Sequence, residues 1–214
     1  MKKYFFIILL ITISLQAQFD FAVSMGIHAV HNPSLRDYVN TNFASSEEQL
    51  STFNATAMFK GECDYTVSNN FQVGIEYGLQ IYSFNTSFAG IGTYDISYFH
   101  HKPSVLAFYV ISGEGYKFKF GGGVGYRIIS VDEQLPTSTL EYNYKSSGLG
   151  FVGKAQAHTS LGGNFYVFLE LDARYDLPGE PENNGKKIEN IVLDETVNFN
   201  SLSIGLNIGI SLFL

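Results

Sequence analysis

The chain has 214 residues, of which 45% are hydrophobic and only 15% are charged, with 20 acidic residues against 13 basic ones. Because such an acidic chain is poorly suited to the phosphate backbone, we exclude nucleic acid as a partner. The one cysteine, Cys63, cannot form an intramolecular disulfide, and we expect it to be a small buried or lipid-facing filler.

The N-terminus has the three parts of a secretory signal peptide. Lys2 and Lys3 precede an apolar run, and Gln16-Ala17-Gln18 follows it. The run holds about a dozen residues, fewer than the roughly twenty of a transmembrane helix, and small Ala17 suits a cleavage site. We therefore predict that residues 1–17 are removed and that residues 18–214 form the mature domain. Loss of the two lysines leaves this domain with a net charge of −9.

A hydrophobic period of two recurs along the mature chain and predicts β-strands. It is clearest in residues 71–82, 165–175 and 202–212. Similar but noisier runs bring the number of strands to eight, at residues 19–29, 51–67, 98–112, 116–130 and 147–161. No helical period persists over a useful length. No apolar stretch after the signal approaches eighteen residues either, so any membrane span must be made of strands.

Tight and long connections alternate between these strands. Ser68-Asn69-Asn70, Gly113-Glu114-Gly115 and Gly162-Gly163-Asn164 have hairpin-turn chemistry. The long polar connections are residues 30–50, 85–97, 131–146 and 178–196. Short periplasmic turns and long extracellular loops are typical of bacterial outer-membrane barrels. We therefore predict an all-β, closed, antiparallel up-and-down transmembrane β-barrel of eight strands, with both termini in the periplasm.

The polar face of the strands carries charges that would point into the lumen of a membrane barrel. Six are basic and five are acidic: Lys60, Glu62, Asp64, Glu76, Lys117, Lys119, Arg127, Lys154, Glu170, Asp172 and Arg174. Small residues on the same face leave room for them, namely Gly74, Gly78, Gly121, Gly123 and Gly125. Because an eight-stranded barrel is only wide enough for side chains or one small ligand, we predict a lumen plugged by salt bridges rather than a pore.

Aromatic residues near the strand ends predict two interfacial girdles. One comprises Phe21, Tyr65, Phe71, Phe118 and Phe165 toward the periplasm, and the other Phe53, Phe99, Tyr126 and Tyr175 toward the outside. The same residues would equally suit the core of a soluble β-sandwich. For the whole chain, a soluble periplasmic, lipocalin-like barrel that binds an apolar ligand is an alternative, provided that the apolar face points inward. Strand parity does not choose between the two directions, so this alternative stays open.

The run Gly121-Gly122-Gly123-Val124-Gly125-Tyr126, the closing strand at Leu202–Leu214 and the signal sequence resemble the outer-membrane β-barrel domain family of Bacteroidetes, the PorT-like group. The resemblance covers the mature chain. It implies an integral outer-membrane protein of a Gram-negative cell envelope, in contact with outer-membrane lipid and lipopolysaccharide. It also implies that the barrel-insertion machinery takes up the closing strand, although the chain ends Phe213-Leu214 where such signals favour a terminal aromatic.

Some eight-stranded outer-membrane barrels modify lipid A, and His158-Thr159-Ser160 puts a base and a nucleophile on one face of a strand. The pair lies beside the turn at residues 162–164, hence in the periplasmic half, and no acidic group is spaced to orient the histidine. A lipid A modifying enzyme therefore stays an alternative. The leading prediction has no catalytic residue, cofactor or metal, and leaves any chemical role of His158 and Ser160 open.

The other histidines offer no ligand cluster. His100 and His101 face opposite sides of one strand and cannot chelate a metal together. His28 and His31 border the first loop, where we expect a solvated surface.

The predicted loops hold an acidic excess: Glu47, Glu48, Asp95, Asp132, Glu133, Glu141, Glu180, Glu182, Glu189, Asp194 and Glu195. We expect these charges to keep the loops solvated, with divalent cations bridging to lipopolysaccharide as an alternative. Because loops carry function more often than scaffolds, a structural or surface-interaction role would use an unknown ligand at residues 30–50 or 178–196.

Overall fold

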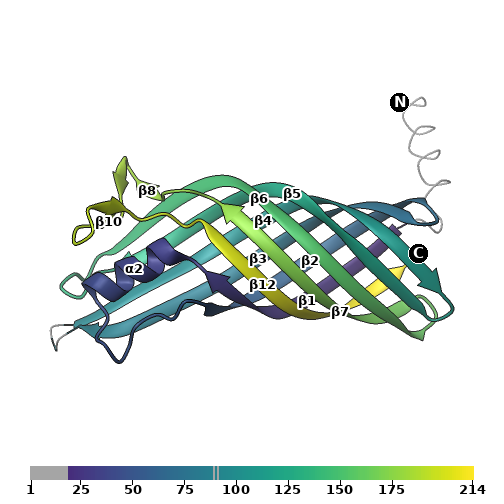
Figure 1. The fold of residues 1–214 in the computed structure, drawn as a ribbon, viewed down its shortest axis with the longest axis horizontal. Coiled ribbons are helices and arrows are strands. Elements are labelled where there is room, and N and C mark those ends of the chain that lie inside the picture. Colours follow the sequence, from purple (N-terminus) through teal and green to yellow (C-terminus); the bar gives the residue numbers. More distant parts are fainter. Residues whose placement is uncertain (1–18, 89, 91) are drawn as a thin grey trace, which may run out of the picture.

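The computed structural model describes residues 19–88, 90 and 92–214, so the predicted signal peptide lies outside the described residues. Within that part of the chain, eight long antiparallel strands form a ring (Figure 1). They are β1 (Phe19–His31), β2 (Asn54–Ser68), β3 (Phe71–Phe88), β4 (Gly92–Gly113), β5 (Tyr116–Gln134), β6 (Glu141–Gly162), β7 (Phe165–Leu177) and β12 (Ser201–Phe213).

Pairing between the first and last long strands closes the ring. β1 pairs with β12 from Asp20↔Phe213 to His31↔Leu202, and every other long strand pairs with its neighbour in sequence. Because the ring of long strands is closed, it has no unpaired strand edge, as a sheet that spans a bilayer requires. The predicted all-β, up-and-down, eight-stranded barrel is therefore confirmed.

The three tight turns, the beginning of β1 and the end of β12 all lie at one end of the barrel, which we call the turn end (Figure 1). There Phe213 N donates to Asn164 O at 3.0 Å, and Leu214 N donates to Phe19 O at 2.9 Å. Gly115 and Gly163 have φ of 78° and 56°, a left-handed conformation that glycine adopts without strain. The opposite end, with the long connections, is the loop end.

One helix and four very short strands lie in the connections of the loop end. The helix α2 (Pro33–Asn42) begins after Asn32, whose side chain accepts from Leu35 N at 3.0 Å. The long connection predicted over residues 30–50 is thus present, but the prediction missed the helix within it. The connection after β7 contains β8 (Glu182–Asn183), β9 (Lys186–Lys187), β10 (Glu189–Asn190) and β11 (Glu195–Thr196). Among the described residues, no helix has the length and apolar character needed to cross a membrane.

Strands β3 to β6 run further into the loop end than predicted. Residues 85–97 and 131–146, expected to be loops, belong mostly to the hairpins β3–β4 and β5–β6. Alternation continues there with its polarity reversed. On β3, Ser83 and Asn85 face outward, while Tyr82 is buried and Phe84 is partly buried. A segment beyond the bilayer has water outside and its own core inside, so the reversal marks where the membrane ends.

Between that boundary and the turn end, the apolar face of every long strand points outward. Ile27 on β1 is 69% exposed, and aliphatic residues on the other strands are similarly exposed. All nine aromatic residues predicted for the two girdles lie on the exposed surface. A lipocalin-like barrel needs the opposite direction, because its apolar residues enclose the ligand. The outward direction therefore supports a barrel surrounded by lipid and removes the argument for the soluble alternative.

Candidate functional site

Charged side chains are buried inside the barrel. Ten of the eleven charges predicted there are buried, and Lys117 is partly buried. The sequence analysis missed three further charges on the same inward faces: Asp20, Lys102 and Asp176. Asp20 and Asp176 follow the strand parity of their neighbours, so one more step of the alternation would have found them. Lys102 lies before Pro103 in a noisy strand.

The ion pairs form three groups along the barrel, the first near the turn end. Lys119 Nζ lies 2.7 Å from Asp64 Oδ2 and 2.9 Å from Asp20 Oδ2. Lys117 Nζ lies 2.9 Å from the same Asp20 oxygen and 3.6 Å from the centroid of the Phe213 ring. The inward ring of Phe213 and these four charges thus occupy the mouth of the lumen at the turn end.

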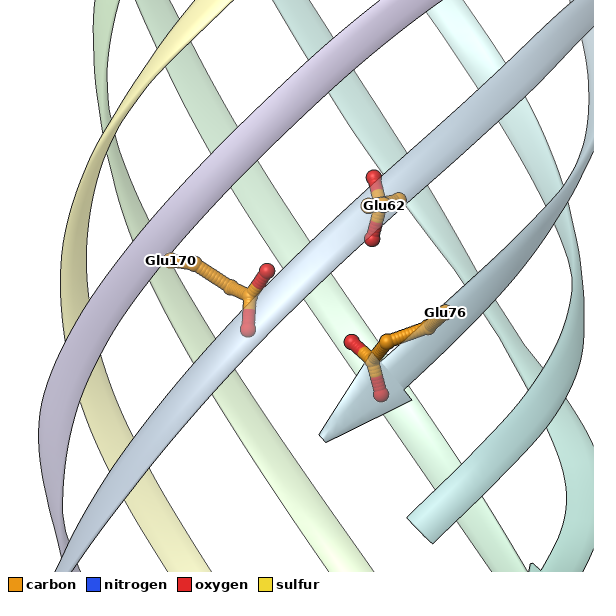
Figure 2. A group of neighbouring side chains, drawn as sticks. All are labelled: Glu62, Glu76 and Glu170. Carbon is orange, nitrogen blue, oxygen red and sulfur yellow. The ribbon is translucent and has the colours of Figure 1, made fainter. Parts of the chain in front are cut away.

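The middle group is built around Lys154 on β6. Its Nζ lies 2.5 Å from Glu62 Oε2, 2.5 Å from Glu76 Oε2 and 3.0 Å from Glu170 Oε2. Figure 2 shows these three carboxylates pointing toward one another, and their side chains belong to β2, β3 and β7. Their spacing matches that of metal ligands, but the ammonium already supplies the cation that they need. The arrangement is therefore explained by ion pairing, without a metal.

Lys60 and Arg174 extend the middle group. Lys60 Nζ lies 2.9 Å from Asp172 Oδ2 and also contacts Glu170. Arg174 Nη2 lies 2.9 Å from Glu76 Oε1 and 3.0 Å from Asp172 Oδ2. Glu76, Glu170 and Asp172 are thus each shared between cations, whereas Lys154 is the only cation that contacts Glu62 in the described part of the chain. Sharing offsets the desolvation of a buried charge better than an isolated pair does.

The third group lies toward the loop end, where Lys102 Nζ and Arg127 Nε both contact Asp176. Here Arg127 also stabilises the wall. The β4–β5 ladder is interrupted between His101 and Ser104, at the position of Pro103, which has no N–H to donate. Arg127 Nη1 donates to Tyr126 O at 3.0 Å and to Pro103 O at 3.3 Å. The guanidinium thereby supplies hydrogen bonds where the ladder has none.

Charge balances within the lumen and not at the loop end. The lumen holds seven basic residues, Lys60, Lys102, Lys117, Lys119, Arg127, Lys154 and Arg174, and seven acidic ones, Asp20, Glu62, Asp64, Glu76, Glu170, Asp172 and Asp176. The loop end has only Arg36, Lys145, Lys186 and Lys187 against Asp37, Glu47, Glu48, Asp95, Asp132, Glu133, Glu141, Glu180, Glu182, Glu189, Asp194 and Glu195. Apart from Glu114 in a turn, the excess negative charge of residues 19–214 is therefore concentrated at the loop end.

A separate apolar core lies on the loop-end side of the charged lumen. This loop-end core packs α2 and the segment before β12 against the inner faces of β3, β4 and β5, through Leu35, Tyr38, Val39, Leu50, Tyr82, Tyr94, Ile96, Tyr98, Ile129, Val131, Ile188, Val197 and Phe199. Because it buries the apolar face of α2, this packing explains why a helix forms in a segment without a long helical period.

One carboxylate is buried within the loop-end core. Glu133 Oε1 accepts from Tyr38 Oη at 2.6 Å and from Tyr94 Oη at 2.9 Å, which joins α2 to the barrel wall. Glu133 lies beyond the apolar outer band, which ends on β5 near Ile128. Burial raises the pKa of Glu133, although the two tyrosine hydrogen bonds act in the opposite direction. Burial beside this carboxylate also raises the pKa of Tyr38.

The structure does not bring His158 and Ser160 together. His158 Nδ1 lies 3.0 Å from Ser211 Oγ, and its Nε2 lies 3.1 Å from Gln156 Oε1. Ser160 Oγ instead accepts from Gly162 N at 3.2 Å, in the turn. His158 is buried and its ring stacks on Phe168 at 4.6 Å between centroids. These contacts explain both side chains structurally.

The remaining histidines divide between the two faces of the wall. The expectation of a solvated His28 was wrong: it is buried in the lumen, with Nε2 3.2 Å from Asn207 Oδ1 and Nδ1 3.5 Å from Asp172 Oδ1. Its even position on β1 is shared with Asp20 and already indicated the lumen. His100 is buried, whereas the outer His101 bonds Tyr77, so the predicted opposite directions are confirmed.

The closed ring, the outward apolar band and the polar interior define a transmembrane β-barrel. Neither a protein-family model nor a curated protein matches this chain. Among solved structures, it is similar to a major outer membrane protein from Thermus thermophilus, with a TM-score of 0.53, 14% identity and coverage of 92% of this chain and 99% of that one.

Two further structures share the fold. One is Ail, the attachment invasion locus protein of Yersinia pestis, in complex with the heparin analogue sucrose octasulfate, with a TM-score of 0.52, 10% identity and coverage of 92% and 99% of the two chains. The other is Neisserial surface protein A, with a TM-score of 0.51, 12% identity and coverage of 92% and 97%. These likenesses place the chain in the fold of small outer-membrane barrels.

Proposed function

We propose that this chain is an integral outer-membrane protein whose lumen is closed and whose loop end acts at the cell surface. The observation that carries the proposal is the division of charge: positive and negative charges balance in the lumen and each takes part in an ion pair, while the loop end is strongly acidic. A selective pore would instead favour rings of one sign. The role is structural or adhesive rather than enzymatic.

Two layers support the closed lumen. The ion-pair groups occupy the lumen from the turn end up to the loop-end core. That core, together with α2, covers the ion pairs on the side of the loop end. Passage of a solute would require breaking several buried pairs, each of which leaves an uncompensated charge. Conductance across a planar lipid bilayer tests this. Folded protein should show no steady conductance above that of the bilayer, and a stable ohmic conductance would refute the closed lumen.

We propose that the outer band contacts lipid directly, including the acyl chains of lipopolysaccharide. An apolar groove of about 870 Å³ on the outer wall runs past Phe21, Cys63, Tyr77 and Tyr126. Fractionation of the native host tests the location. The protein should appear in the outer-membrane fraction, and its electrophoretic mobility should change on boiling. Recovery in the soluble periplasmic fraction would refute an integral membrane protein.

We further propose that β12 is the segment recognised by the barrel-insertion machinery. Its Leu212 pairs with Phe21 on the outward face, and Leu214 is exposed, whereas the Phe213 ring lies 4.4 Å from Tyr166 inside the barrel. Such a signal would be read through its alternating outward aliphatic residues. A chain in which Leu212 is replaced by Asp should accumulate unfolded in the periplasm, and normal assembly of this variant would argue against the signal.

The assignment to the PorT-like group of Bacteroidetes stays a proposal, supported by the glycine run and the closing strand. The run has a physical role here: a Cβ at Gly121 would collide with Ala107 O and a ring carbon of Phe108, and one at Gly123 with Val105 O and a methyl group of Leu106. Glycine is therefore needed where β5 passes the large inward residues of β4.

A further inference from the structure

The hairpin of β10 and β11 presents three consecutive aliphatic residues at its tip. Ile191 is 84% exposed, Val192 62% and Leu193 45%. Turns usually carry Gly, Asn, Asp, Ser or Pro, which suit turn geometry and remain hydrated. A run of exposed aliphatic side chains is unfavourable in water unless a partner covers it, and such runs mark interaction sites.

Hydrogen bonds at the base of the hairpin hold the tip in place. Asn190 is buried, and its Oδ1 accepts from Leu193 N at 3.3 Å and from Asn42 Nδ2 at 2.9 Å. Ile188 belongs to the loop-end core and accepts from Val197 N at 2.9 Å, which extends the hairpin into that core. The tip is thus fixed to α2 and the barrel, so a partner would bind it without ordering a loose loop.

The charges around the tip restrict the partner. Glu189, Asp194 and Glu195 belong to the same hairpin, and the loop end as a whole has three acidic residues for each basic one. An anionic glycan or an anionic lipid surface would be repelled. A partner that combines aliphatic side chains with several cations complements both features at once.

We propose that the tip Ile191–Leu193 and the acidic side chains of its hairpin form a docking surface for a cationic amphipathic polypeptide. Aliphatic residues of that polypeptide would cover the tip, while its Lys and Arg side chains pair with Glu189, Asp194 and Glu195. The inference rests on the proposed function, because the loop end must face the cell exterior to meet such a partner.

The test uses the mature barrel in phosphatidylcholine nanodiscs and a labelled short peptide of leucine and lysine with one apolar helical face. Empty nanodiscs give the lipid background. A second peptide, with the same leucines and glutamate in place of lysine, separates charge from apolar contact. The wild-type barrel should bind the cationic peptide saturably, and added salt should weaken the binding.

The main variant replaces the tip by Ile191→Ser, Val192→Ser and Leu193→Ser. Its affinity should fall by about tenfold or more, since covering a single aliphatic side chain can account for that factor. Leu140→Ser is the matched control, because Leu140 is 64% exposed in another turn of the loop end, and it should bind like the wild type. Glu189→Gln with Glu195→Gln should weaken binding and its salt dependence.

Heat-modified mobility verifies the fold of each variant, and Ile191→Ser alone replaces the triple variant if that one does not fold. The proposal is overturned if the wild type does not bind, if the tip variant binds equally well, if the acidic peptide binds as tightly, or if empty nanodiscs account for the signal. Conductance of the same purified barrel across a planar lipid bilayer keeps the two proposals separate. If the barrel does not conduct and does not bind the peptide, only the docking surface is refuted.

Discussion

Replacement of Lys154 tests whether the ion pairs of the lumen stabilise the barrel. Lys154→Met keeps the length of the side chain and removes the ammonium that contacts Glu62, Glu76 and Glu170. Breaking a buried ion pair by removing one partner costs about 3–5 kcal/mol. Three carboxylates lose a cation at once here, although Arg174 still compensates Glu76 and Lys60 still compensates Glu170. We therefore expect a loss of about 3–5 kcal/mol in unfolding free energy.

The assay is reversible urea unfolding of the barrel in lipid vesicles, followed by circular dichroism and by gel mobility without boiling. Lys187→Met is the matched control, since the Lys187–Glu180 pair lies on the exposed loop end, and it should leave the unfolding curve unchanged. Glu62→Gln in the Lys154→Met background should recover part of the loss, because it restores neutrality to the lumen while Gln156 can still donate to residue 62. A loss below about 1 kcal/mol in Lys154→Met would refute the reasoning.

Two further substitutions test the wall and the loop end. Gly150→Ala would place a Cβ against the Arg127 guanidinium and should lower the unfolding free energy by about 1–3 kcal/mol. Gly153→Ala is the control, because a Cβ at Gly153 meets nothing within 4 Å, and it should leave stability unchanged. Equal unfolding midpoints of the two variants would contradict this role of Gly150. Because the folded pKa of Glu133 is raised, the stability of the loop-end core should fall as pH rises above 4.5, the ordinary glutamate value, through the folded pKa. Hydrogen exchange at Val39, corrected for its intrinsic rate, should report that loss, and Glu133→Gln should abolish it; an unchanged pH dependence in the variant would assign it to another group.

The architecture could be predicted because a β-barrel repeats a local rule. Each strand shows its outward and inward faces through a period of two, so eight strands and most of the charged lumen follow from short windows of sequence. The turns were equally local, since Gly115 and Gly163 have the left-handed φ that their positions require. Even His28 and Asp20, which the prediction left out of the lumen, stand at inward positions of β1.

The loop end resisted prediction because its features depend on contacts between distant segments. The helix α2 carries only Leu35, Tyr38 and Val39 as a buried face, and these residues pack against strands far along the chain. The strand extensions around residues 83–88 alternate with reversed polarity, which looks like a polar loop unless the position of the membrane boundary is known. The contact of Tyr38 with Glu133 spans 95 positions and leaves no signal in either segment alone.

The central claim is that the apolar face of the barrel meets lipid up to a boundary and water beyond it. Spin labels at single cysteines on the outward positions of β3, in a Cys63→Ser background, test it most directly through their accessibility to oxygen and to a water-soluble nickel complex. Labels from residue 71 to residue 81 should be accessible to oxygen and protected from nickel, and the preference should reverse at residues 83, 85 and 87. Nickel accessibility along the whole outward face would contradict the claim, because it would show a barrel surrounded by water.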